Sequence, residues 1–79
     1  MNEQIDFIWS SKKEYNVLHP LFEFFSSKNS IKSNLIKIHK NKLVNSVTIS
    51  KISNYVIIAH SHTYYRLISF GWKGEFIYV

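Results

Sequence analysis

The last third of the chain alternates between strand-like and helix-like segments, and this alternation limits the possible folds more than any other feature. Residues 55–59 form a continuous apolar, β-rich run, YVIIA, of the kind found in strands buried on both faces. Residues 64–70 place apolar side chains at helical spacing, and Gly71 stands where a helix usually ends. Residues 76–79, FIYV, form a second buried-type strand. Parallel strands need such a helical crossover, so the stretch predicts a parallel sheet covered by helices.

Two more strands are expected in the first half of the chain. Residues 5–9, IDFIW, are dominated by β-branched and aromatic side chains, although Asp6 is unusual in a central strand. Residues 34–39, NLIKIH, alternate apolar side chains with Lys37 and His39. This alternation is typical of a strand near the edge of a sheet.

A helix is expected over residues 14–28. Its apolar side chains recur at helical spacing: Leu18, Leu21, Phe22 and Phe25. Ser11 and Glu14 have the spacing of a capping box, in which each side chain bonds to the other's backbone N–H. Pro20 leaves two alternatives, because a proline either kinks a helix or occupies its first turn.

Residues 41–53 are ambiguous. Asn, Ser, Thr, Val and Ile are weak helix formers, and residues 47–52 also fit an added strand in an α+β fold. A short helix is favoured because the flanking strands need a crossover. The predicted order is therefore β-α-β-α-β-α-β, which is an α/β fold with a Rossmann-like parallel four-stranded sheet. Residues 1–79 would form a single domain or domain fragment.

Composition excludes several classes of protein. The chain has no cysteine, so it has neither disulfides nor thiolate metal ligands, and no apolar run approaches the roughly 18–20 residues of a membrane span. The first residues lack the features of a signal peptide, which predicts a cytoplasmic protein. Neither G-x-G-x-x-G nor a P-loop is present, so no cofactor is predicted. The net charge of +5 favours contact with phosphates, nucleic acid or the anionic inner face of a membrane.

Ligands of open parallel sheets bind beyond the carboxyl ends of the strands, and two polar groups are expected there. The first group could hold an anion at a helix N-terminus and consists of Ser10, Ser11, Lys12 and Lys13. The second is a ligand-contact candidate and consists of His60, Ser61 and His62, followed by Thr63. The alternative for both groups is helix capping, in the second case by the hydroxyls of residues 61–63, with solvated lysines. The histidine pair lacks further metal ligands, and no carboxylates form an acid/base pair, so no metal site or catalytic residue is predicted.

The stretch NYVIIAHSHTYYRLISFGWKGEFIYV resembles part of the N-terminal half of GT-B-fold transferases, above all the CDP-glycerol glycerophosphotransferase family. In that family a similar strand is followed by a short helix, a G-x-K-G/K turn and a strand ending in I-Y-V/I, often with His-Gly directly after it. The resemblance implies an acceptor-side fragment of an enzyme that builds cell-surface polymers such as teichoic acid or capsule. The chain stops where His-Gly would begin and lacks the donor-binding second domain, so no catalytic residue carries over and inactivity alone is expected. The implied partners are an anionic polymer acceptor and the missing domain.

The alternative function is that of a stand-alone basic module that binds nucleic acid or an acidic protein.

Overall fold

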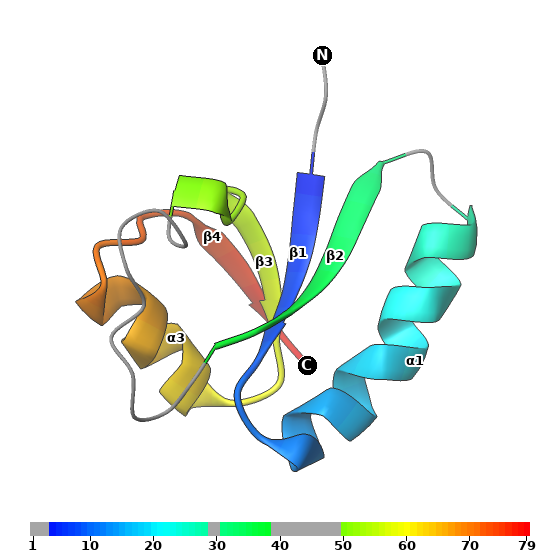
Figure 1. Cartoon of the computed structure of the whole chain (residues 1–79), viewed down its shortest axis with the longest axis horizontal. Coiled ribbons are helices and arrows are strands. Elements are labelled where there is room, and N and C mark those ends of the chain that lie inside the picture. The colour runs from blue at the N-terminus through cyan, green and yellow to red at the C-terminus, as the bar shows by residue number, and fades with distance from the viewer. Residues whose placement is uncertain (1–3, 29–30, 39–49) are drawn as a thin grey trace.

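The chain folds into a four-stranded, entirely parallel sheet with helices on it, as Figure 1 shows. The structure is a computed structural model and describes residues 4–28, 31–38 and 50–79. The elements are β1 (Gln4–Trp9), α1 (Lys12–Lys28), β2 (Lys32–Lys37), β3 (Tyr55–Ile58), α3 (Ser61–Ser69) and β4 (Glu75–Tyr78). The strand order is β2-β1-β3-β4. The predicted α/β fold with a Rossmann-like parallel sheet is confirmed.

Helices α1 and α3 lie on opposite faces of the sheet (Figure 1). Successive residues of a strand point to opposite faces, and β1 shows this directly. The ring of Phe7 meets those of Phe22 and Phe25 on α1, at centroid distances of 5.6 and 5.9 Å. Ile8, the next residue, packs instead in a cluster with Leu67 of α3. The sheet therefore has a core on each side of β1.

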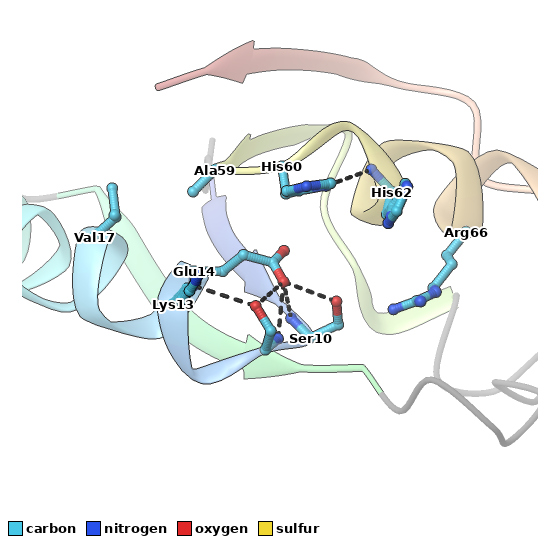
Figure 2. A pocket seen from close by; sticks show the side chains of 9 residues that line it. Ser10, Lys13, Glu14, Val17, Ala59, His60, His62 and Arg66 are labelled. Atoms are coloured by element: carbon cyan, nitrogen blue, oxygen red, sulfur yellow. Dashed lines mark hydrogen bonds between the residues drawn. The ribbon is translucent and has the colours of Figure 1, made fainter.

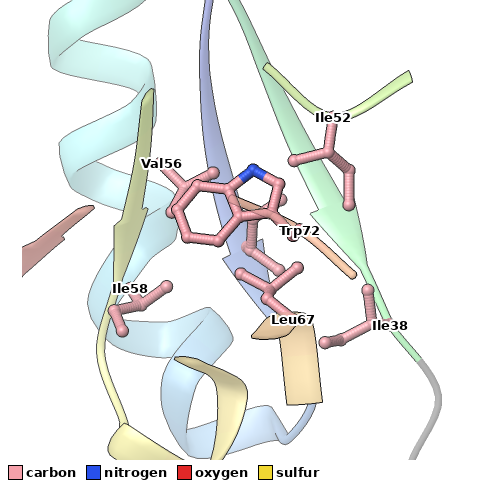
Figure 3. Packing of buried hydrophobic residues seen from close by; sticks show 7 residues of the cluster. Ile38, Ile52, Val56, Ile58, Leu67 and Trp72 are labelled. Carbon is pink, nitrogen blue, oxygen red and sulfur yellow. The ribbon is translucent and has the colours of Figure 1, made fainter. Parts of the chain in front are cut away.

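The larger core lies between the sheet and α3 (Figure 3). Its buried members are Ile8, Ile38, Ile52, Val56, Ile58, Leu67 and Trp72. The indole of Trp72 also donates a hydrogen bond from Nε1 to the Ser53 carbonyl oxygen, at 2.9 Å. This bond ties the segment between α3 and β4 to the segment before β3.

Asp6 lies in the inner strand β1, where a carboxylate is unusual. Three hydrogen-bond donors satisfy it there. The side chain is fully buried. It accepts hydrogen bonds from the amides of Gln4 (2.9 Å) and Asn34 (3.0 Å) and from the backbone N–H of Ser53 (2.8 Å). A buried carboxylate is tolerable when its oxygens are hydrogen-bonded. Asp6 thus joins β1, β2 and the start of β3 near the amino ends of the strands.

Helix α1 begins at the predicted capping box. The N–H of Ser11 donates to the Glu14 carboxylate (2.8 Å), and the N–H of Glu14 reaches the Ser11 hydroxyl (3.4 Å). The helix then runs through Pro20, so the alternative in which it begins at that proline is wrong. Leu18 is fully buried, whereas Leu21 is 43% exposed. The buried face of the helix is therefore narrower than the apolar stripe that the sequence predicted.

The face of the sheet that carries α1 is covered over β1 and β2 but is open over β3 and β4. Helix α1 contacts β1 and β2. The register aligns Phe7 with Ile57 and Ile57 with Ile77, so these three side chains share that face. Ile77 is 61% exposed there, and every residue of β4 is exposed. The prediction that β3 and β4 are both buried on two faces is therefore wrong.

Several element boundaries also differ from the prediction. Strand β2 covers Lys32–Lys37 rather than residues 34–39, and it does lie at a sheet edge, as expected. The ambiguous segment 41–53 falls largely outside the described residues, and its described end is helical at residues 50–51.

Within the described ranges, no helix has the length and apolar character needed to cross a membrane.

Candidate functional site

A crevice opens where the chain changes direction across the sheet. From β1 the chain crosses to β2 on one side, and it later returns to form β3 on the other side of β1. The carboxyl ends of β1 and β3 therefore form a topological switch point, where α/β proteins usually bind ligands. The crevice there has a volume of about 440 Å³ (Figure 2). It is lined by Ser10, Ser11, Lys13, Glu14, Val17, Ala59, His60, His62 and Arg66.

Glu14 is the hydrogen-bonding centre of this crevice (Figure 2). Its Oε2 accepts from the hydroxyls of Ser11 (2.7 Å) and Ser10 (3.0 Å), as well as from their backbone N–H groups. Its Oε1 accepts from the hydroxyl of Thr63. Because the carboxylate is buried and surrounded by donors, it serves as a structural acceptor that joins the N-termini of α1 and α3.

Two opposing effects set the charge state of Glu14. Burial raises the pKa of the carboxyl group, because it disfavours the ionised form. Hydrogen bonds from Thr63, Ser11 and Ser10 favour the ionised form and together outweigh burial, so the pKa lies below its ordinary value of 4.5. Glu14 is therefore an anion at neutral pH, and its charge is already compensated by neutral donors.

His60 caps helix α3 with its ring. Its backbone is extended, and its Nδ1 accepts a hydrogen bond from the N–H of His62, at 3.1 Å. Nδ1 therefore carries no proton, which leaves the Nε2 as the ring donor of a neutral His60. Helix capping with a histidine satisfied by backbone, the alternative for this group, is therefore confirmed, but the cap is the ring of His60 and not a hydroxyl of residues 61–63.

The two histidine rings do not form a metal site with other residues of the described part. Their centroids lie 4.4 Å apart. Among the described residues, no group of three or more His, Cys, Asp or Glu side chains has the arrangement of a metal site. The rings are better placed to contact a ligand in the crevice, which both of them line.

Two side chains bring permanent positive charge to the crevice. Lys13 is exposed in the first turn of α1, and Arg66 lies on α3. The Nη1 atom of Arg66 is fully buried and has no hydrogen-bond partner within the described part of the chain. A buried donor without an acceptor is costly, by about 1–3 kcal/mol or more for a charged group. Arg66 is therefore the least satisfied polar group of the site.

The comparisons with known proteins provide no family for this chain. No protein-family model matches it, and no curated protein or solved structure is significantly similar to it. The function must therefore be argued from the crevice itself.

The crevice brings together most of the residues selected from the sequence. Ser10, Ser11, Lys13, His60 and His62 line it, whereas Lys12 and Ser61 do not. The hydroxyls of Ser10 and Ser11 are engaged by Glu14, so neither is free for an anion as the sequence suggested.

Two important residues were not among the site residues selected from the sequence. Glu14 was interpreted only as a helix cap, whereas Thr63 was named with the second polar group but without its bond to Glu14. Arg66 was named, with Tyr64 and Tyr65, only as a residue that could contact a partner. Its position one turn after His62 was the available signal, because residues four apart share a helix face.

Proposed function

We propose that this protein binds a phosphate-bearing polymer acceptor in the crevice between the carboxyl ends of β1 and β3. The observation that carries the proposal is the convergence of Lys13, His60, His62 and Arg66 on a crevice at the switch point of a parallel sheet. Ligands of such sheets bind at this position. The positive charges of Lys13 and Arg66 favour an anion, and phosphate is the anion that best matches an arginine together with a lysine.

The N-termini of the two helices also favour a negatively charged ligand. The N-termini of α1 and α3 meet at the crevice through Glu14 and Thr63. Each helix N-terminus carries a partial positive charge, of about half an elementary charge. The Glu14 carboxylate offsets part of this charge, while Lys13 and Arg66 add two full positive charges. The balance favours a ligand that carries one or two negative charges.

In this proposal the chain is the acceptor-side unit of a GT-B-type glycosyl- or glycerophosphotransferase. The resemblance of residues 54–79 to that class and the parallel sheet support it. The unit would place a polymer phosphate beside a second domain, which supplies the activated donor. It would act at the inner face of a membrane, where such polymers are built, and would show no transferase activity alone.

The proposal is tested by titrating the ¹⁵N-labelled chain with a short glycerol phosphate oligomer at low salt. We expect amide shifts to change at Ser10, Ser11 and Lys13 and at His60, His62 and Arg66. Lys13→Gln should weaken binding several-fold, because it removes one charge from the crevice. Lys28→Gln, at the far end of the same helix, should leave the affinity unchanged. Absence of shifts at both groups of residues would refute the proposal.

A basic module for nucleic acid is the second candidate, and the net charge of +5 is the observation that favours it. Nucleic-acid binding would spread shifts over the lysines of several elements and would fall steeply with added salt. We therefore propose the same titration with a single-stranded RNA of matched phosphate number. Tighter binding of the RNA than of the glycerol phosphate oligomer would favour this second function.

A further inference from the structure

The crevice has two chemically different ends. Figure 2 shows Val17 of α1 at one end and Arg66 of α3 at the other, with Glu14 and Ser10 between them. Ala59 lies toward the Val17 end, and His62 lies toward the Arg66 end (Figure 2). The Val17 end therefore offers apolar surface, with Lys13 between it and Glu14, whereas the Arg66 end offers a guanidinium, so a bound molecule would be oriented along this axis.

The polar groups between the two ends are already occupied. The Ser10 hydroxyl lies 3.0 Å from Glu14 and 3.2 Å from the Thr63 hydroxyl. The Ser11 hydroxyl donates to Glu14, and Nδ1 of His60 accepts from the N–H of His62. A ligand would therefore find its strongest donors at the Arg66 end rather than at the middle of the crevice.

Arg66 has the chemistry to bind a tetrahedral anion. Its guanidinium is planar, always charged and suited to two parallel hydrogen bonds with phosphate. Its Nη1 has no acceptor among the described residues and is fully buried. That atom is closed to a water-sized molecule, so a phosphoryl oxygen would bind the guanidinium on the side that lines the crevice. The volume of about 440 Å³ also greatly exceeds the ~30 Å³ that a water molecule occupies, so there is room for a larger group beside the phosphoryl.

We infer that the ligand of this crevice is an organic phosphate whose phosphoryl group binds Arg66 and whose carbon skeleton lies toward Val17 and Ala59. This inference rests on the proposed function, because it assumes that the crevice binds an anion. It adds the orientation of the ligand and assigns the primary anion contact to Arg66 rather than to Lys13.

The experiment compares inorganic phosphate with phenyl phosphate, using calorimetric or NMR titration of the full chain. The unaltered protein should bind phenyl phosphate at least threefold more tightly than inorganic phosphate. Arg66→Gln should weaken the binding of both ligands about tenfold. Arg66→Lys should weaken it less, because lysine keeps the charge but loses the two parallel N–H donors of the guanidinium. Since the Nη1 atom forms no hydrogen bond to the described residues, Arg66→Gln should keep the thermal midpoint within a few degrees.

Two matched variants test the orientation. Val17 is 46% exposed and lines the crevice, and Val17→Ser should abolish the preference for phenyl phosphate without changing the affinity for inorganic phosphate. Leu21 is similarly exposed on the same helix but does not line the crevice, and Leu21→Ser should change neither affinity. Equal loss of both ligands in Val17→Ser would overturn the orientation.

The outcomes separate this inference from the proposed function. Binding of both anions that survives Arg66→Gln but is lost in Lys13→Gln would overturn the inference and leave an anion-binding crevice. Failure of the unaltered protein to bind either anion, or the glycerol phosphate oligomer, would overturn both.

Discussion

The hydroxyl of Thr63, in the first turn of α3, donates a hydrogen bond to Oε1 of Glu14, in the first turn of α1. The two residues are 49 positions apart in the chain, and both are buried. Helices on opposite faces of the sheet are thus joined at the one edge where their N-termini meet. Glu14 also lines the crevice, so the stability of the fold and the geometry of the site depend on one carboxylate.

Replacing that carboxylate should destabilise the protein. Glu14→Gln keeps the size of the side chain but puts an NH₂ group where the structure presents only donors. We expect the free energy of unfolding to fall by about 2 kcal/mol or more, since hydrogen bonds to a charged group are lost and a buried donor is left unpaired. Urea denaturation followed by circular dichroism measures this, with Glu23→Gln on the exposed side of α1 as the control. Equal midpoints for the two variants would contradict the role of Glu14.

Acid should weaken the fold through the same residue. The pKa of Glu14 is lower in the folded chain than its ordinary value of 4.5, so the ionised form is favoured by folding. The stabilisation is complete above pH 4.5 and is lost as the pH falls through the lower, folded pKa. Unfolding free energies measured between pH 7 and pH 3 should therefore fall at the acid end. The fall should be smaller in Glu14→Gln, and an identical acid dependence in both proteins would refute this explanation.

The alternation of strands and helices could be predicted from the sequence because it depends on local patterns. β-branched runs such as residues 55–59 and the capping box at Ser11 and Glu14 are features of a few neighbouring residues. The exposure of β4 could not be predicted, because it depends on which face α1 covers and on which strand lies at the edge. An apolar run has the same sequence pattern whether or not a neighbour covers it.

The site was predictable only in part, for a related reason. The rule that ligands bind at the carboxyl ends of parallel strands selected Ser10, Lys13 and His60, which line the crevice. The strand order was needed to show that β1 and β3 form the switch point. The contact between Glu14 and Thr63 joins distant parts of the chain, so no local pattern indicated that these side chains were already occupied.

The two glycines should respond differently to alanine. An added Cβ at Gly74 would lie 2.4 Å from the carbonyl oxygen of Asn54 and 2.5 Å from the Trp72 ring, so the backbone has to move. That same oxygen accepts from the N–H of Glu75 at 2.8 Å, which holds the start of β4. We expect Gly74→Ala to cost about 2–3 kcal/mol, as overpacking does.

Gly71→Ala is the matched comparison for that change. Gly71 has a φ of +95°, and an added Cβ there meets no atom within 4 Å. Only the backbone conformation is strained, at a cost of about 1 kcal/mol. Urea denaturation monitored by tryptophan fluorescence compares the two variants. A larger loss in Gly71→Ala than in Gly74→Ala would show that β4 does not pack closely against Asn54.

Substitutions of His60 should show that its ring acts as the cap of α3. His60→Ala removes the acceptor for the N–H of His62, and we expect a loss of about 1 kcal/mol, as for other N-cap residues. His60→Asn keeps an acceptor at a preferred N-cap residue and should restore most of that stability. Thermal and urea midpoints of the two variants decide the matter. If asparagine is no better than alanine, the ring stabilises the protein by its contact with His62, at 4.4 Å between centroids, rather than by capping.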